Sequence, residues 1–253
     1  MAAGLPLEAD IQASPVVHAD ETPWPIRSEE GRGYSWALCD AISPKVFFNL
    51  ATNRGAVHAR NLFGATFTGV RISDDYMPYR ADTLPGRQQL CWAHLYRCIR
   101  DVRYNSNLPE EQLPYVTIWY EAFASIYRDL RRYLDEPYEE PARRHQTQKL
   151  WHKVRRLAAQ SPPKRTGQPE KLTRLKAQLL RAGQDRLFTC LPDDTPCDNN
   201  RAERDLRSLV LKRKRSFGSQ TPKGATALST ILSLCTTTWR TEPEQYFKTL
   251  AAL

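Results

Sequence analysis

The chain contains 253 residues, enough for one large domain or two small ones with a substantial hydrophobic core. Its formal net charge of +9 favours polyanionic partners such as nucleic acid, although many basic proteins bind none. The absence of a run of about 18 apolar residues argues against a transmembrane helix, and the N-terminal stretch lacks the basic-then-apolar pattern of a secretion signal. The six cysteines are too sparse for a disulfide scaffold, so we expect a cytoplasmic protein without membrane association.

The N-terminal third of the chain is predicted to form strands and short helices. A strand begins at Val16, and aromatic and branched residues predict further strands over 33–41, 45–52, 69–76 and 87–94. Residues 55–63 are predicted to form a short helix, and the last strand runs into another helix. The expected order is strand, strand, strand, helix, strand, helix, strand, helix. This order indicates an α/β arrangement with a mixed sheet covered by helices.

The middle of the chain has a different character. Apolar residues at helical spacing predict a helix over 113–134, and basic amphipathic helices are expected over 141–160 and 171–183. After Pro196 come a helix rich in arginine and lysine and a final helical pair. We therefore expect three segments: residues 1–94 as the first part of an α/β core, 95–190 as a helical insertion, and 191–253 as helices that complete the core.

Carboxylates lie at three places where elements end or begin. Asp20 shares a strand face with Val16 and His18, Asp74 is in phase with the preceding strand, and Glu203 lies among cations one turn into a helix. Converging carboxylates can hold Mg²⁺ ions and so support the cutting and joining of phosphodiesters. Spacing alone does not show that the three acids meet.

Each acid also has a purely structural interpretation. Asp20 could end a strand, Asp74 and Asp75 could form a turn, and Glu203 could belong to a capping box with Asn200. His18 could orient a metal-bound water or simply pack within its strand. Trp24, Trp36 and Trp92 are expected in the core rather than as base-stacking platforms. The cysteine and histidine residues that could bind zinc, without a paired CxxC motif, are Cys91, His94, Cys98, Cys190 and Cys197.

Five short motifs occur in an order that resembles the catalytic region of bacterial DDE transposases. They are "HADETPW" (18–24), "SDDY" (73–76), "CWAH" (91–94), "DNNRAERDLR" (198–207) and "RKRSFGS" (213–219). The chain is most similar to the insertion-sequence-sixty-six type (TnpC), from about residue 13 to the C-terminus. "HADET" together with "DNNxAER" is more specific than either motif alone.

The resemblance implies an RNase H-like fold with an all-helical insertion between the second aspartate and the glutamate. Asp20, Asp74 and Glu203 would be the catalytic acids and the ligands of two Mg²⁺ or Mn²⁺ ions. The second motif usually reads Ser-Asp-Gly-Tyr in this family, and Asp75 replaces the glycine, so the metal-facing aspartate is Asp74 by alignment with Asp75 as the alternative. The family's N-terminal DNA-end-recognising and zinc-binding region is not represented, which implies a fragment or a short open reading frame.

DNA is the expected partner, contacted by phosphate-binding cations and by the Cys-x-x-His element. The implied function is phosphodiester hydrolysis and strand transfer at transposon ends, in a bacterial cytoplasmic protein associated with the nucleoid. By analogy a homodimer and accessory proteins are expected. A non-catalytic or domesticated DNA-binding remnant and a general RNase H-like nuclease are the alternatives. The expected DNA-binding residues are Cys91, His94, Arg97, Asn200, Arg201, Arg204, Arg207, Lys212, Arg213, Lys214 and Arg215.

Overall fold

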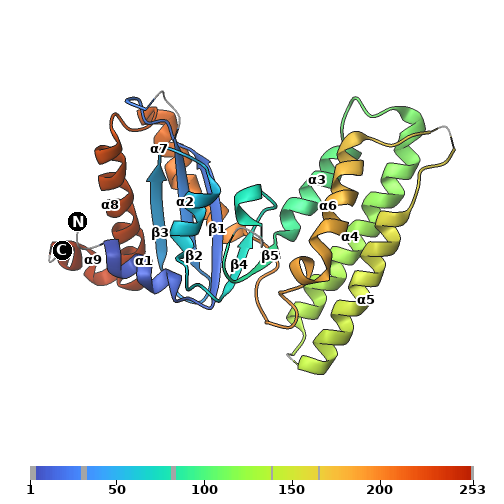
Figure 1. Cartoon of the computed structure of the whole chain (residues 1–253), viewed down its shortest axis with the longest axis horizontal. Coiled ribbons are helices and arrows are strands. Elements are labelled where there is room, and N and C mark those ends of the chain that lie inside the picture. Colours follow the sequence, from blue (N-terminus) through green and yellow to red (C-terminus); the bar gives the residue numbers. More distant parts are fainter. Residues whose placement is uncertain (1–3, 30–32, 81–83, 138, 165, 252–253) are drawn as a thin grey trace. The chain divides into compact units, whose positions relative to one another are not determined.

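The computed structural model describes residues 4–29, 33–80, 84–137, 139–164 and 166–251 (Figure 1). The chain forms two compact units. The first, called the core unit below, contains residues 1–88 and 199–253, and the second, the helical unit, contains residues 89–198. The helical unit is therefore inserted, along the sequence, between Asp74 and Glu203.

A mixed five-stranded sheet organises the core unit, in the order β3-β2-β1-β4-β5. β1 pairs with β2 in antiparallel and with β4 in parallel orientation, and β2 pairs with β3 in antiparallel orientation. The expected α/β arrangement with a mixed sheet is confirmed. The strands are β1 (Val16–Pro23), β2 (Tyr34–Asp40), β3 (Val46–Ala51), β4 (Val70–Ser73) and β5 (Arg87–Leu90), of which the first two β5 residues belong to the core unit.

Helices cover both faces of this sheet because successive strand residues alternate between them. Val17 and Ala19 of β1 pack with α1 (Gly4–Gln12) and α2 (Ala56–Phe63). The other face packs against α7 (Asn200–Ser216) and α8 (Pro222–Thr241), through Ala37, Cys39 and Phe48 of the sheet. Trp24, Trp36 and Trp92 are buried as expected.

The segment after β4 differs from the prediction. The strand expected over 69–76 ends at Ser73, because the Asp74 carboxylate accepts the Tyr76 N–H at 2.9 Å and turns the chain. A single 3₁₀ turn, η1 (Met77–Tyr79), lies where a helix was expected, and Pro78 within it disfavours a longer helix. Residues 81–83 of this connection lie outside the described chain.

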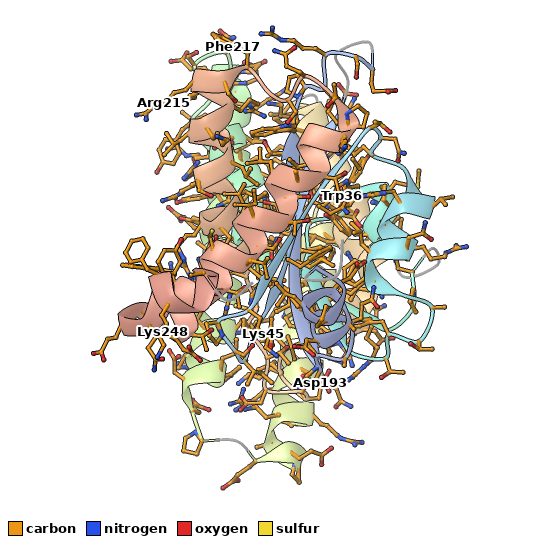
Figure 2. The ribbon with its side chains drawn as sticks, turned by 90° about the vertical axis from the view of Figure 1, so that its left-hand side faces the viewer. Trp36, Lys45, Asp193, Arg215, Phe217 and Lys248 are labelled. Atoms are coloured by element: carbon orange, nitrogen blue, oxygen red, sulfur yellow. The ribbon has the colours of Figure 1, made fainter. Side chains whose placement is uncertain are left out.

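The turn between α7 and α8 is fixed against the end of β1. Phe217, labelled in Figure 2, follows the end of α7 and has a left-handed backbone (φ 58°), and Gly218 has φ 106°. A Cβ at Gly218 would lie 2.1 Å from the Pro25 carbonyl oxygen, so only glycine fits. Ser219 then accepts the Trp24 indole N–H at 3.0 Å. Two of the sequence motifs, "HADETPW" and "RKRSFGS", therefore meet in this turn.

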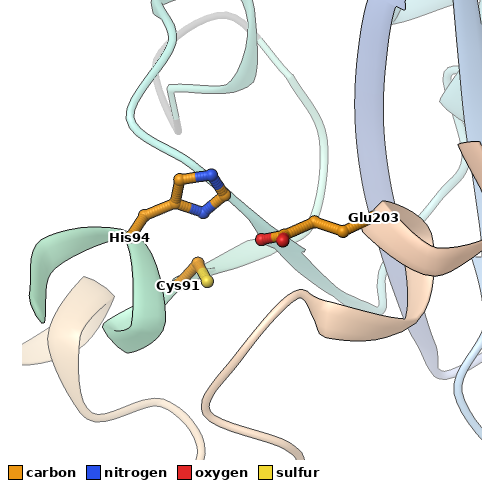
Figure 3. A group of neighbouring side chains, drawn as sticks. All are labelled: Cys91, His94 and Glu203. Carbon is orange, nitrogen blue, oxygen red and sulfur yellow. The ribbon is translucent and has the colours of Figure 1, made fainter. Parts of the chain in front are cut away.

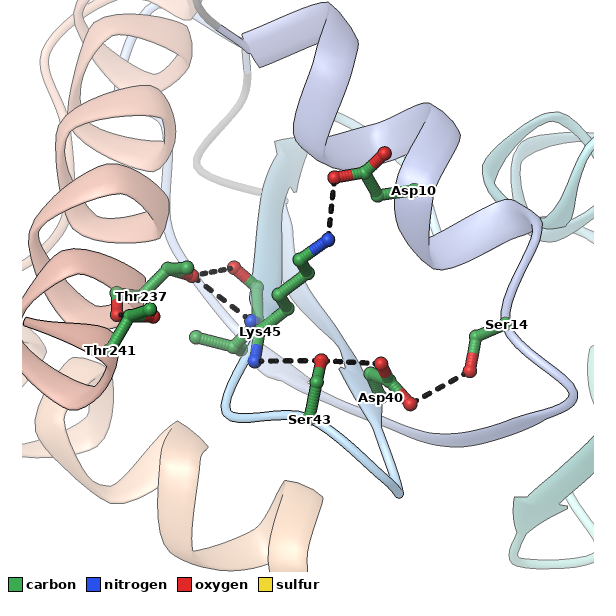
Figure 4. Close-up of polar contacts among 8 residues, drawn as sticks. Asp10, Ser14, Asp40, Ser43, Lys45, Thr237 and Thr241 are labelled. Carbon is green, nitrogen blue, oxygen red and sulfur yellow. Dashed lines mark hydrogen bonds and ion pairs between the residues drawn. The ribbon is translucent and has the colours of Figure 1, made fainter.

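The outer edge of β3 is covered by hydroxyl groups of α8. Thr237 Oγ1 accepts the Val46 N–H at 3.1 Å and donates to the Val46 carbonyl at 3.2 Å (Figure 4). One helical turn earlier, Ser233 Oγ accepts the Phe48 N–H at 2.8 Å. These hydroxyls bind backbone groups that a further strand would otherwise pair with. Figure 4 also shows the Lys45–Asp10 ion pair beside this edge.

The helical unit has a hydrophobic core of its own. The indole of Trp92 stacks on Phe123 and Tyr127, with ring centroids 5.4 and 5.9 Å apart, and its N–H donates to the Leu187 carbonyl at 2.6 Å. Among the described residues no helix is both long and apolar enough to cross a membrane. The remaining elements are α3 (Trp92–Arg103), η2 (Glu110–Gln112), α4 (Leu113–Asp135), α5 (Glu140–Ala159) and α6 (Glu170–Leu187), with η3 (Pro243–Gln245) and α9 (Tyr246–Ala251) in the core unit.

Candidate functional site

The parallel pairing of β1 with β4 brings Asp20 and Asp74 to the same edge of the sheet. The register joins Val16 to Val70 and His18 to Ile72. Asp20 lies two residues beyond His18, and Asp74 two residues beyond Ile72, so both aspartates follow the last paired residues at the same end of the two strands. Because side chains alternate along a strand, Asp20 lies on the sheet face of His18, which is the face covered by α7.

The start of α7 is attached to β1 by Asn199. Its side-chain amide donates to the Ala19 carbonyl at 2.7 Å, and its amide oxygen lies 3.3 Å from His18 Nδ1. Asn199 is fully buried and is the residue that precedes the helix, yet its side chain makes no cap hydrogen bond. The N-cap position of α7 is therefore Asn199, one residue earlier than a capping box of Asn200 and Glu203 would require. The Asn199 side chain binds β1 instead of capping the helix.

Glu203 belongs to the first turn of α7 and is half-buried. Its neighbour Ala202 and the residue one turn on, Leu206, are buried against the sheet, which fixes the side of the helix that Glu203 occupies. The N-terminal end of a helix favours negative charge, so a carboxylate is stable at this position.

Burial and neighbouring charges act on Asp20. Burial is the largest of the causes that raise the pKa of Asp20 to about 8; the charges of Glu21, Asp74 and Glu203 contribute to the same rise, and the hydrogen bond from the Glu21 N–H opposes it. Like charges have this effect on a carboxyl group only at short range in a poorly solvated site. Asp20, Asp74 and Glu203, from β1, the end of β4 and α7, thus lie in the same region of the core unit and are called the acidic cluster below, although among the described residues their carboxylate oxygens do not all come within 4.8 Å of one another.

The two adjacent aspartates differ in their surroundings. Asp74 accepts the Tyr76 N–H, and its charge contributes to the raised pKa of Asp20. The carboxylate of Asp75, only 7% exposed, lies 4.0 Å from the guanidinium of Arg80. This geometry favours Asp74 as the member of the acidic cluster.

Glu21 and Arg54 also lie beside the cluster, although the sequence did not assign them a role there. Glu21 faces the opposite side of β1 from Asp20, and its carboxylate accepts from Arg54 Nε at 2.8 Å. The adjacency of Glu21 to Asp20 was visible in "HADET", but the distant Arg54 gave no local signal.

The cations of α7 fall into two groups. Arg204, Arg207, Lys212, Lys214 and Arg215 are exposed, and Figure 2 shows Arg215 near the end of the helix. Arg201 instead donates to the Ser43 carbonyl at 2.5 Å, and Arg213 donates to Thr22 Oγ1 at 3.2 Å and to the Pro23 carbonyl. The exposed cations are free to face a polyanion, whereas Arg201 and Arg213 also secure α7 to neighbouring strand ends.

The other expected DNA-binding residues lie at the start of α3 and α7. Cys91 precedes α3 and is buried, while His94 and Arg97 lie half-buried within that helix; Asn200, also half-buried, begins α7. Of the three side chains drawn in Figure 3, Cys91 and His94 belong to the helical unit and Glu203 belongs to the core unit.

The helical unit contains all the cysteine and histidine side chains considered for zinc. Burial raises the pKa of the Cys197 thiol to about 12, with further contributions from Asp198 and Cys91. Within the described part of the chain, no three of the cysteine and histidine side chains proposed for zinc gather closely enough to share an ion.

Comparison with known proteins identifies relatives of the chain. A model of the family described as "Transposase IS66 family" matches residues 5–227, which is most of the chain. The chain is also 29% identical over 185 residues to the "Uncharacterized protein y4jO" of Sinorhizobium fredii, an alignment that covers 72% of this chain and 51% of that protein. The chain thus spans about half the length of this curated relative. No solved structure matches the chain.

Proposed function

Because the chain belongs to the Transposase IS66 family, we propose that it is the catalytic region of a DDE transposase, with an RNase H-like core that cuts and joins DNA at transposon ends. The observation that carries the proposal is the acidic cluster of Asp20, Asp74 and Glu203. Its members come from three elements far apart in sequence, and the pairing of β1 with β4 and the Asn199 contact with β1 bring these elements together.

The acidic cluster has the composition that a divalent metal requires. It offers carboxylate oxygens, the ligands that Mg²⁺ and Mn²⁺ prefer, from backbone positions held by a strand, a strand end and a helix. Bound cations would offset the negative charges that, together with burial, raise the pKa of Asp20. Two bound ions would supply activation of the attacking oxygen and stabilisation of the leaving oxygen in phosphoryl transfer.

The protein's own residues then have separable roles. Asp20, Asp74 and Glu203 would supply the carboxylate oxygens that bind the metal. Asn199 keeps the start of α7 against β1, so that Glu203 stays near Asp20. The exposed cations of α7 bind phosphates of the DNA backbone. No covalent protein–DNA intermediate is required, because water or a DNA 3′-hydroxyl supplies the attacking oxygen. Action as a homodimer on paired ends, with accessory proteins, remains part of the proposal by analogy.

Mg²⁺-dependent nicking of DNA that carries the ends of the encoding element tests this function. We expect Asp20→Asn, Asp74→Asn and Glu203→Gln each to lower the nicking rate by several orders of magnitude, because metal position sets the attack geometry. Asp75→Asn is the matched control, since this neighbour of Asp74 lies beside Arg80 and should retain nicking. Salt-sensitive DNA binding with no nicking by the unmodified protein would instead favour the DNA-binding remnant. Equal nicking of DNA without transposon ends would favour a general nuclease.

A further inference from the structure

Arg54 contacts both strand-end segments that carry the proposed metal-binding aspartates. It lies in the loop between β3 and α2, and Glu21 is adjacent to Asp20 on β1. The Arg54 guanidinium donates to the Glu21 carboxylate through Nε at 2.8 Å and through a second nitrogen. The Glu21 side chain is only 2% exposed, so this ion pair is screened little by water.

The same guanidinium reaches the Asp74 segment through Tyr76. Its central carbon lies 3.6 Å from the centre of the Tyr76 ring, a close cation–π contact. The Tyr76 hydroxyl donates to the Arg54 carbonyl at 3.2 Å, and the Tyr76 N–H donates to Asp74 at 2.9 Å. Arg54 therefore holds Tyr76 by its side chain and its backbone, and Tyr76 in turn holds the Asp74 carboxylate.

The charges explain why a cation is needed at this position. The Glu21 carboxylate is buried and lies next to Asp20 along β1. A buried carboxylate beside an acidic cluster is stable only when a cation and hydrogen bonds compensate it. Arg54 supplies that cation from the sheet face opposite to Asp20, where it does not occupy the space between the acids.

We propose that Arg54 is a positioning residue that sets the separation of Asp20 and Asp74 for divalent-metal binding. This inference rests on the proposed function, because it requires the acidic cluster to bind a metal. Arg54 itself contacts neither metal nor DNA in this role. It acts through Glu21 on one aspartate and through Tyr76 on the other.

Mn²⁺ affinity, measured by titration calorimetry on the whole chain without DNA, tests this role. Arg54→Met should weaken Mn²⁺ binding about tenfold, as the loss of an outer-shell partner of a metal site does. Arg54→Lys should recover part of the affinity, because it restores the charge without the planar fork and the stacking. Lys45→Met is the matched control, since it removes another ion pair of the core unit, with Asp10 at 2.7 Å, and should leave Mn²⁺ affinity unchanged.

Two results overturn the inference in distinguishable ways. If Asp20→Asn abolishes Mn²⁺ binding while Arg54→Met binds Mn²⁺ as tightly as the unmodified protein, the positioning role is wrong and the proposed function survives. If Asp20→Asn binds Mn²⁺ normally, the metal site and the role of Arg54 both fail. Circular dichroism of each variant, together with the Arg54→Lys rescue, separates a folding defect from a loss of positioning.

Discussion

Asp20 lies where burial and three neighbouring carboxylates all disfavour its ionised form. Burial raises its pKa to about 8, from an ordinary value near 3.8, with Glu21, Asp74 and Glu203 contributing. At a pH between about 4 and 8, the Asp20 carboxyl is ionised in the unfolded chain but still protonated in the folded protein. Without metal, the stability contributed by Asp20 is therefore present below about pH 4 and is lost as pH rises toward 8.

Replacement of Asp20 by asparagine should stabilise the metal-free protein. In EDTA at pH 8 we expect Asp20→Asn to raise the free energy of unfolding by about 1–3 kcal/mol, because asparagine removes a buried charge and its repulsion from neighbouring carboxylates. The gain should shrink as pH falls below 4, where the carboxyl becomes protonated in both states. Urea unfolding at several pH values measures the effect, and a gain that does not depend on pH would contradict this account.

At the level of elements, α8 takes the place of a further strand along the edge of β3. The hydroxyls of Ser233 and Thr237, one turn apart, match two alternate residues of the strand, Phe48 and Val46. An edge strand with unpaired N–H groups is prone to pair with other chains. Ser233 and Thr237 have lower helix propensity than alanine, and their presence in α8 is explained by the hydrogen bonds that they make to the edge of β3.

Removal of both hydroxyls should weaken this edge. Ser233→Ala combined with Thr237→Val should lower the free energy of unfolding by about 1–3 kcal/mol, because two buried backbone N–H groups lose their partners. Amide hydrogen exchange at Val46 and Phe48 should accelerate. Thr230→Val is the control, since the Thr230 hydroxyl donates to Thr226 within α8. Unchanged exchange at both strand positions would show that α8 does not protect the edge.

The exposed cations of α7 make a prediction about DNA binding. If Arg204, Arg207, Lys214 and Arg215 each neutralise a phosphate, each replacement by glutamine should lower the slope of log K against log salt by about 0.9 on duplex DNA. Arg201→Gln should act differently and lower protein stability as well, because it releases the β2–β3 turn. DNA binding measured between low and moderate salt gives the slopes, and urea unfolding gives the stability of Arg201→Gln. An unchanged slope in the variant that carries all four replacements would show that these cations do not contact the DNA.

For the whole molecule, the two units have separate hydrophobic cores. The buried cluster of the helical unit contains residues from 90 to 197, while the two main clusters of the core unit lie on either face of its sheet. Units with their own cores can unfold independently, and each then contributes its own thermal transition.

Calorimetry of the whole chain should therefore show two unfolding transitions. Leu130→Ala in the helical unit and Leu209→Ala in the core unit, both fully buried, should each lower a different transition. The expected cost is about 2–5 kcal/mol for each variant, because each substitution leaves a cavity. One cooperative transition that both variants lower equally would instead show that the units unfold together.

Local patterns in the sequence were sufficient to predict most of the elements. Helical spacing predicted α4, α5 and α6, and aromatic and branched runs predicted β2 and β3, since both signals are periodic and local. The sequence missed α1 and extended β4 past Ser73. The turn at Asp74 depends on one side-chain hydrogen bond that periodicity does not report.

The sequence by itself determined the mixed α/β class and the family, and it supplied the three acids as candidates. Only the tertiary structure decided where they lie, because strand pairing and helix packing join residues far apart in the chain. The β1–β4 pairing brings the segments of Asp20 and Asp74 to the same end of the sheet, and Asn199 attaches the helix of Glu203 to β1. The link from Arg54 to both strand ends, and the binding of Arg201 to backbone carbonyls, likewise arise from long-range contacts that no local pattern encodes.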